Sequence, residues 1–200
     1  MLFPSYKETK VLYHVVDIIH LKSVLSNGIK INERNKYSDE KYDEFNKYLD
    51  KNKSEKIPPW VKREKAFFAS LNFKKNTKWH SHSALLAIRI QEEKCWIANE
   101  NLANEIYDPF VLQDIDKFNN AKKYMKKYGV KSALKYWEHS FSFREYFDLG
   151  IDKRENYDEE VMIFHDIYPQ DLNCLMIVTD HNIYTPKQWQ KKYISQGLSL

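Results

Sequence analysis

The most regular feature of the chain is a series of short apolar runs that are separated by polar and amphipathic stretches. Runs of about four to eight residues, rich in β-branched and aromatic side chains, are typical of strands. The pattern predicts strands at residues 11–16, 66–71, 84–90, 95–98, 160–164 and 174–178.

Between these runs, apolar residues recur at helical spacing. After the first predicted strand, Asp17 is a typical N-cap and Gly28 a typical C-cap, and the apolar positions between them share one helical face. Gly129 is expected to break a later helical stretch into two pieces. Further helices are predicted at residues 38–56, 99–107 and 110–138.

Strands and helices do not alternate strictly along the chain, which favours an α+β fold built on antiparallel sheet. A length of 200 residues is typical of one domain, so we expect residues 1–200 to form a single domain, with a lysine-rich helical insertion at about 110–138. Aromatic residues make up 15% of the chain, which argues against disorder. Only four glycines are present, which excludes a glycine-rich phosphate loop.

The cysteines and the N-terminal segment indicate the compartment. Cys95 and Cys174 form neither a disulfide framework nor a zinc-binding spacing, and both are expected to be reduced. The N-terminal segment lacks the apolar run of a signal peptide, and no stretch approaches the roughly 18 apolar residues of a membrane span. We therefore expect a cytoplasmic protein with no membrane partner.

Charge is distributed unevenly. The net charge is only +4, but residues 117–139 carry seven lysines and a single acidic residue, Glu138. Such a segment is either a solvated helix face or a nucleic-acid-binding surface, where lysines meet phosphates and aromatic rings stack on bases. The candidate phosphate contacts are Lys122, Lys123, Lys126 and Lys127, and the candidate stacking rings are Tyr124, Tyr128, Tyr136 and Trp137.

Common catalytic motifs are absent, and no metal is expected, because the pair His80 and His82 has no evident third ligand. Two residues at opposite ends of the chain stand out instead. His14 lies inside the first apolar strand, and Glu160 opens a late one. Taken singly, each fits a structural role: a half-buried histidine and a solvated strand end.

Their surroundings resemble a known family. The opening, from Leu12-Tyr13-His14 to Asn27-Gly28-Ile29, and the closing part, Glu160-Val161-Met162-Ile163-Phe164 followed by Pro169, resemble the ADP-ribosyltransferase fold, most of all the DarT-type (DUF4433-like) DNA ADP-ribosyltransferases. RNA 2′-phosphotransferases are similar more distantly. The resemblance implies two packed, mostly antiparallel sheets with peripheral helices. It also implies a toxin-like or phage-conflict role, with an antitoxin as partner.

The resemblance implies NAD as substrate and Glu160 as the catalytic carboxylate. A carboxylate beside the ribose stabilises the positive charge that develops when the nicotinamide bond breaks. Glu159 competes for this role, but strand alternation directs the two side chains to opposite faces. The family arginine corresponds to Arg63 or Arg34, and either could pair with the pyrophosphate. Further residues expected at the NAD site are His14, Tyr13, Phe68, Ser70 and Trp60.

The predicted function is therefore an NAD-dependent mono-ADP-ribosyltransferase, a pentosyltransferase that modifies a macromolecule, with nucleic acid (DNA) as the favoured acceptor. Three alternatives stay open: a protein acceptor, an RNA 2′-phosphotransferase, and a catalytically silent nucleic-acid-binding module.

Overall fold

The computed structural model describes residues 3–32, 40–73, 82–180 and 182–194. The chain folds as two compact units. Unit 1 comprises Met1–Lys30, Ala69–Ile90 and Asp166–Leu200, and unit 2 comprises Ile31–Phe68 and Gln91–His165. Each unit carries its own four-stranded antiparallel sheet with helices, so the α+β class is confirmed.

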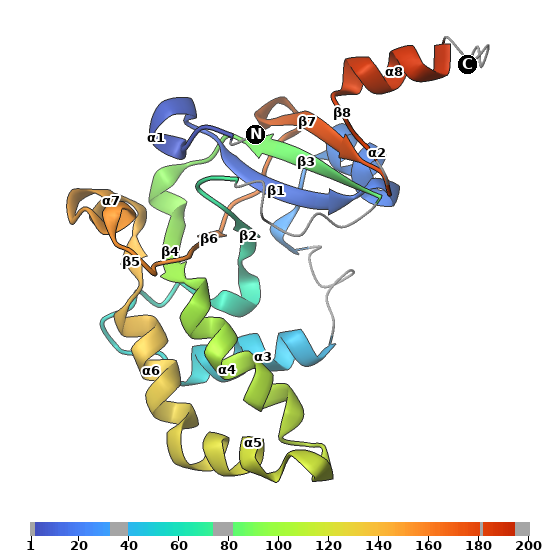
Figure 1. Ribbon diagram of the computed structural model, residues 1–200. Helices are drawn as coiled ribbons and strands as arrows, with labels where there is room; N and C mark the ends of the chain where they lie inside the picture. The colour runs from blue at the N-terminus through green and yellow to red at the C-terminus, as the bar shows by residue number, and fades with distance from the viewer. Residues whose placement is uncertain (1–2, 33–39, 74–81, 181, 195–200) are drawn as a thin grey trace. The chain divides into compact units, whose positions relative to one another are not determined.

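The sheet of unit 1 has the order β1-β3-β7-β8 (Figure 1). Every residue of β3 is buried, as expected for a strand that pairs on both edges and is covered on both faces. The predicted strands at 11–16, 84–90 and 174–178 are confirmed with shifts of a few residues at their ends. The strands are β1 (Leu12–Asp17), β3 (Ser83–Ile88), β7 (Leu172–Val178) and β8 (Ile183–Tyr184).

Gly28 ends the first long helix of unit 1, as predicted. Its φ of 75° lies in the region that favours glycine, and a Cβ at this position would lie 2.1 Å from the carbonyl oxygen of Ile167. The next residue, Ile29, forms an isolated antiparallel bridge with Ile167. The helices of this unit are α1 (Tyr6–Thr9), α2 (Ile18–Asn27) and α8 (Pro186–Ile194), with the 3-10 turn η7 (Pro169–Asp171).

The sheet of unit 2 has the order β2-β6-β4-β5. The central strands β4 and β6 pair antiparallel, and Ala98 lies opposite Glu160. The bounds are β2 (Phe67–Ala69), β4 (Cys95–Asn99), β5 (Phe141–Ser142) and β6 (Glu159–Ile163). Apolar residues of β4 and β6 pack with the helices of this unit into one buried cluster, which includes Trp96, Met162 and Trp137.

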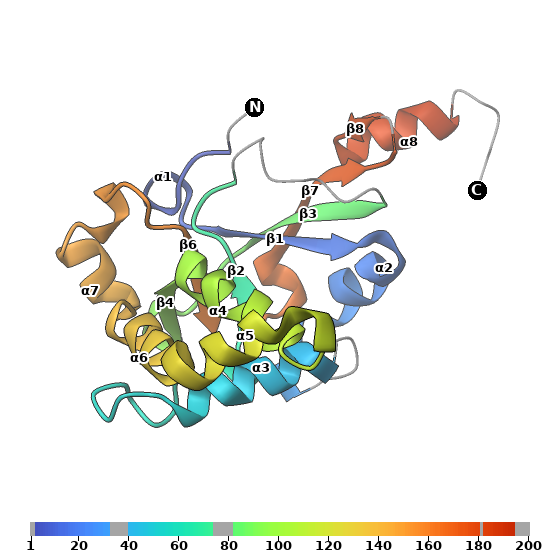
Figure 2. The ribbon, with the colours of Figure 1, turned by 60° about the horizontal axis from the view of Figure 1, so that its bottom comes forward.

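Several helices of unit 2 contact one another (Figure 2). The longer ones are α3 (Glu40–Lys51), α4 (Glu100–Leu112) and α6 (Val130–Glu138). The shorter ones are α5 (Asn119–Tyr124), the π-helical turn η5 (Met125–Gly129), α7 (Phe143–Asp148), and the 3-10 turns η2 (Arg63–Lys65), η3 (Glu92–Lys94), η4 (Asp116–Phe118) and η6 (Ile151–Lys153). Helix α3 ends at Lys51, before the predicted residue 56, and near this end the carbonyl of Leu49 accepts the indole N–H of Trp137 at 2.7 Å.

The prediction that Gly129 breaks the helix was wrong. Gly129 has helical angles, and α5, η5 and α6 follow one another without a gap. The glycine serves close packing instead, because a Cβ there would lie 2.6 Å from the hydroxyl of Tyr48 on α3.

Candidate functional site

The first element of the candidate site is the carboxylate of Glu160. This residue is the second of β6, and its side chain is only 6% exposed, whereas that of Glu159 is half-buried. Successive side chains of a strand point to opposite faces. Glu160 therefore lies on the same face of β6 as Met162, which belongs to the buried cluster of unit 2.

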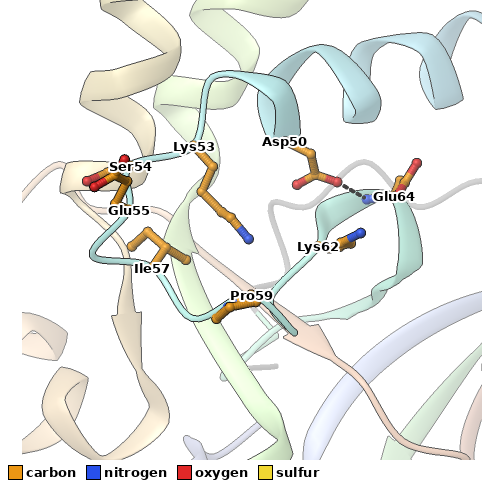
Figure 3. Close-up of a pocket in the computed structure, with 8 residues that line it drawn as sticks. All are labelled: Asp50, Lys53, Ser54, Glu55, Ile57, Pro59, Lys62 and Glu64. Carbon is orange, nitrogen blue, oxygen red and sulfur yellow. Dashed lines mark hydrogen bonds between the residues drawn. The ribbon is translucent and has the colours of Figure 1, made fainter.

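Arg63 lies at the start of the turn η2 and is 2% exposed. Its backbone is held by Asp50, at the end of α3, whose carboxylate accepts the N–H group of Arg63 at 2.8 Å. The same carboxylate accepts the N–H group of Glu64 at 3.0 Å (Figure 3). Burial raises the pKa of Asp50, and these two N–H groups oppose that rise. Asp50 therefore fixes the place from which the Arg63 side chain enters the interior.

A second charged group stabilises the loop that leads to Arg63. The ammonium of Lys53 donates to the carbonyl oxygens of Pro58 at 3.1 Å and Val61 at 2.6 Å, and burial lowers its pKa. Asp50 and Lys53 both line a hollow of about 500 Å³. Because their polar atoms already bind the backbone, we interpret this hollow as a by-product of the loop's anchoring.

The guanidinium of Arg63 is surrounded by acceptors. Nη1 donates to Oε1 of Glu160 and, at 2.8 Å, to the hydroxyl of Tyr136. Nε donates to Oδ1 of Asn46 at 2.8 Å, and Nη2 donates to the hydroxyl of Tyr42 at 3.2 Å. Tyr136 in turn donates to Oε1 of Glu160 at 2.7 Å. We call these five residues the Arg63–Glu160 cluster.

Burial and the neighbouring charge act in opposite directions on Arg63. Burial alone lowers the pKa of Arg63, but the opposite charge of Glu160 raises it well above its ordinary value. Burial also raises the pKa of Tyr136, so its hydroxyl stays protonated and can donate. Two opposite charges inside a protein are tolerated when they are paired and hydrogen-bonded, and both conditions hold here.

Two polar atoms of the cluster keep unused hydrogen-bonding capacity. Within the described residues, Oε2 of Glu160 accepts no hydrogen bond, in contrast to Oε1. Nδ2 of Asn46 is buried and has no partner there. The orientation of Asn46 is determined, because an arginine only donates and the amide oxygen must therefore face Arg63. The cluster thus presents one acceptor and one donor that no described residue satisfies.

A second carboxylate lies near Glu160. Glu100, the first residue of α4, follows Asn99, which pairs with Glu159 across the sheet. Burial raises the pKa of Glu100, and the negative charges of Glu160 and Asp158 raise it further. Sequence reasoning did not identify this residue, because a glutamate in the first turn of a helix is ordinary.

The aromatic candidates differ in accessibility. Phe68 is half-buried, and the guanidinium carbon of Arg63 lies 4.6 Å from the centre of its ring. Trp60 is 45% exposed and packs edge-on against Trp96 and Phe164. Tyr13 is 2% exposed and donates its hydroxyl to the carbonyl oxygen of Pro4 at 2.7 Å. The expectation of Tyr13 at the NAD site is therefore corrected, because its ring is part of the core of unit 1.

The remaining candidates lie in unit 1 or outside the described residues. His14 is half-buried on β1 opposite Leu86, and Ser70 exchanges two backbone hydrogen bonds of 2.9 Å with Tyr13. Arg34 lies outside the described residues. The structure thus joins Arg63 with Glu160, whereas His14 belongs to the other unit and its pairing with Glu160 stays a prediction.

The lysine-rich segment forms α5, η5 and α6 of unit 2. All seven lysines are exposed, as are Tyr128 and part of Tyr124. The prediction that Tyr136 and Trp137 stack on bases was wrong, because both are fully buried in the core. Their burial follows from helical spacing, since Ala133, Tyr136 and Trp137 share one face and the lysines occupy the other.

Three members of the cluster, Tyr42, Asn46 and Tyr136, were missed by sequence reasoning. Asn46 had a detectable signal: it lies next to Phe45 and three residues before Leu49 on the apolar face of a helix, where a polar residue is unusual. A buried polar side chain requires a partner, and here that partner is Arg63. Tyr42 and Tyr136 could not be distinguished in advance from ordinary core aromatics.

Other site types find no support in the structure. Among the described residues, no group of three or more His, Cys, Asp or Glu side chains is arranged to hold a metal ion. No helix in this part of the chain is long and apolar enough to cross a membrane. Comparison of the chain with protein-family models, with curated proteins and with solved structures finds no match.

Proposed function

We propose that the chain is an NAD-dependent mono-ADP-ribosyltransferase that modifies a macromolecule, with nucleic acid as the acceptor. One observation carries the proposal. Glu160, the catalytic carboxylate that the family resemblance implies, and Arg63, one of the two candidates for the family arginine, lie 97 positions apart and yet form a buried ion pair at the start of a strand.

The carboxylate of Glu160, of which only one oxygen accepts hydrogen bonds from described residues, supports the proposed chemistry. Its Oε1 is held by Arg63 and Tyr136, and its Oε2 accepts no hydrogen bond within the described residues. An anchored carboxylate with one oxygen available suits a ribose hydroxyl, which donates to it while positive charge develops on the sugar. In the reaction, the bond between ribose C1′ and nicotinamide nitrogen breaks, nicotinamide leaves with the electron pair, and an acceptor oxygen or nitrogen bonds to C1′ and loses its proton.

Two residues around Glu160 support NAD as the substrate. Asn46 has a buried N–H that lacks an acceptor, which is the kind of donor that an oxygen-rich dinucleotide would satisfy. Phe68 offers an aromatic ring beside Arg63 for stacking on nicotinamide. His14, Ser70 and Arg34, which the resemblance implies for NAD, stay predictions that mutation of each residue can test.

The exposed lysine-rich segment supports a nucleic acid as acceptor. Lys122, Lys123, Lys126 and Lys127 lie on consecutive turns of one unit, with Tyr128 exposed among them. Lysines attract the phosphate backbone without regard to sequence. A protein acceptor would need no such segment, and we therefore rank it second.

One observation favours a second candidate, a catalytically silent nucleic-acid-binding module. Glu160 is almost fully enclosed, and its ion pair with Arg63 has a purely structural explanation that needs no catalysis. NAD turnover distinguishes the two candidates, because only the first releases nicotinamide.

The deciding experiment offers labelled NAD to the full chain together with single-stranded DNA, RNA or a protein lysate in separate reactions. We expect label on the DNA and its loss in Glu160→Gln. Glu159→Gln is the matched control, because it makes the same change one residue away on the opposite face of β6. Glu160→Asp is a further variant that keeps the charge opposite Arg63. Absence of both label and nicotinamide release from folded wild-type protein overturns the proposal and favours the silent module.

A further inference from the structure

We propose that a hollow in unit 2 beside Trp60 binds one base of a single-stranded nucleic acid and its phosphate. The hollow measures about 430 Å³ and is lined by Ile31, Trp60, Lys65, Glu93, Lys94 and Phe164. All of these residues belong to unit 2. The inference rests on the proposed function in one respect, namely that the acceptor is a nucleic acid.

The wall of the hollow is a rigid aromatic surface. The Trp60 ring packs edge-on against Phe164 at 5.3 Å and 86°, and against Trp96 at 6.1 Å and 84°. Such contacts hold the indole by its neighbours' rings while 45% of the residue remains exposed. A nucleobase can stack on an aromatic ring that is positioned in this way, and such stacking is largely independent of base identity.

Polar groups around the hollow match a nucleotide. Within the described residues, the indole N–H of Trp60 and the ammonium groups of Lys65 and Lys94 have no hydrogen-bond or ion-pair partner. Two such lysines suit a phosphate, and the exposed carboxylate of Glu93 suits an exocyclic amine. The backbone of this rim is fixed, because the N–H of Phe164 donates to the carbonyl of Lys94 at 3.0 Å.

The hollow shares its supporting elements with the Arg63–Glu160 cluster. Lys65 belongs to the same 3-10 turn as Arg63, and Phe164 directly follows the strand that carries Glu160. Glu160 and Phe164 are four residues apart, so strand geometry places their backbones about 13 Å from each other. A base in the hollow would therefore be a neighbour of the modified nucleotide, and the site would position the strand for transfer.

A polymer suits the hollow better than a free nucleotide does. Three of its lining residues, Lys65, Glu93 and Lys94, are exposed, so a nucleic-acid strand can extend beyond the hollow on either side of the bound base. The lysine-rich segment belongs to the same unit and supplies further phosphate contacts. We therefore assign a single strand of nucleic acid as the occupant. The experiment must distinguish binding of this strand from binding of free ADP or NAD.

Fluorescence anisotropy with a labelled 15-nucleotide DNA strand tests the site in the full chain. We expect Trp60→Ala to weaken binding about 5- to 150-fold, the range of one base–aromatic stack, and Trp60→Phe to retain most of the affinity. The aromatic control is Tyr168→Ala, an exposed ring of unit 1, which should bind as the wild type does. Thermal unfolding of each variant confirms that it is folded.

Salt dependence provides a second readout. For single strands, the slope of log K against log salt changes by about 0.7 per phosphate contact. Lys65→Gln with Lys94→Gln should therefore reduce the slope by about 1.4, whereas Lys47→Gln with Lys56→Gln, two exposed lysines of the same unit, should not. Unchanged affinity in folded Trp60→Ala overturns the inference. The inference is also overturned if ADP displaces the strand and binds the hollow as tightly as the strand does, because the hollow would then be a site for a free nucleotide.

Nicotinamide release from NAD, measured on the same samples, separates this inference from the proposed function. Binding that depends on Trp60 in a protein that releases no nicotinamide upholds the site and overturns the transferase. Release of nicotinamide with binding that does not depend on Trp60 overturns the site alone.

Discussion

Nη1 of Arg63 donates to both Tyr136 and Glu160, and Tyr136 also donates to the same oxygen of Glu160. Arg63 follows a loop, Tyr136 lies on α6 and Glu160 lies on β6, so three separate elements of unit 2 converge on one carboxylate oxygen. The arrangement fixes the carboxylate in orientation and leaves its other oxygen available. The same three residues thus belong both to the buried interior of unit 2 and to the proposed site.

The buried pair predicts strong coupling between Arg63 and Glu160. Glu160→Ala and Arg63→Ala should each lower the free energy of unfolding by about 3–5 kcal/mol, because each leaves an uncompensated buried charge. Arg63→Met combined with Glu160→Leu should cost much less than the sum of the two single changes. Urea unfolding of the four proteins measures the coupling, and additive effects would contradict a direct pair.

Tyr136→Phe tests the hydroxyl alone. The ring stays in the core, but the change removes one donor to Glu160 and one acceptor from Arg63. We expect a loss of about 1–3 kcal/mol of unfolding free energy, as for a buried hydrogen-bonded group whose partner is removed. Tyr146→Phe is a matched control, because Tyr146 is also a buried tyrosine of unit 2 and lies outside the cluster. Equal losses would show that the position of the hydroxyl is unimportant.

Glu100 predicts a pH-dependent contribution to stability. Its pKa is raised from 4.5 in the folded state, chiefly by burial and then by Glu160, so the folded protein binds this proton more tightly than the unfolded chain does. Stability from this group is therefore lost as the pH rises from about 4.5 through the raised value. Glu100→Gln should remove that loss of stability. Near neutral pH, the variant should therefore unfold at a higher denaturant concentration than the wild type, whereas at pH 4 the two proteins should unfold at the same concentration.

The control for the pH experiment is Glu105→Gln, which neutralises an exposed residue of the same helix. Its unfolding midpoint should stay close to that of the wild type at both pH values. A Glu100→Gln protein with the same pH profile as the wild type would show that the pKa of Glu100 is not raised in the folded protein.

Local sequence patterns predicted much of the secondary structure, but they could not predict which side chains far apart in the sequence pair with each other. The strand at 11–16, the helix that follows and its end at Gly28 depend on neighbouring residues, and all three were predicted. Alternation also indicated that Glu160 and Glu159 face opposite ways. The family arginine was left open between Arg63 and Arg34, and the ion pair of Arg63 with Glu160 was not predicted, because no periodicity relates residues 97 positions apart.

Errors arose where one residue type serves two roles. Tyr136 and Trp137 lie among lysines in the sequence, and so they were interpreted as part of a binding surface. Helical spacing turns them inward, because they share a face with Ala133 and the lysines take the other. Gly129 was interpreted as a helix breaker, although its role is to let α3 approach.

That close approach predicts an unusual effect of alanine at Gly129. In an exposed helix the change should stabilise by about 1 kcal/mol. Here the new Cβ would lie 2.6 Å from the Tyr48 hydroxyl and 3.0 Å from Cε of Met125, so we expect a net loss of about 1–3 kcal/mol. Tyr48→Phe should recover part of that loss in the double variant, and thermal unfolding of the four proteins checks this. A stabilised single variant would contradict the close contact.

The lysine-rich segment predicts a steep salt dependence of DNA binding. If Lys122, Lys123, Lys126 and Lys127 each neutralise one phosphate of a single strand, changing all four to Gln should reduce the salt slope by about 2.8. The buried residues of α6 should be unaffected, since these lysines are exposed, so the variant should unfold at the same temperature as the wild type. Titration of a labelled strand between about 50 and 200 mM salt measures the slope. A slope equal to that of the wild type would identify the segment as a solvated helix face, and the phosphate contacts would then have to come from other lysines of the chain.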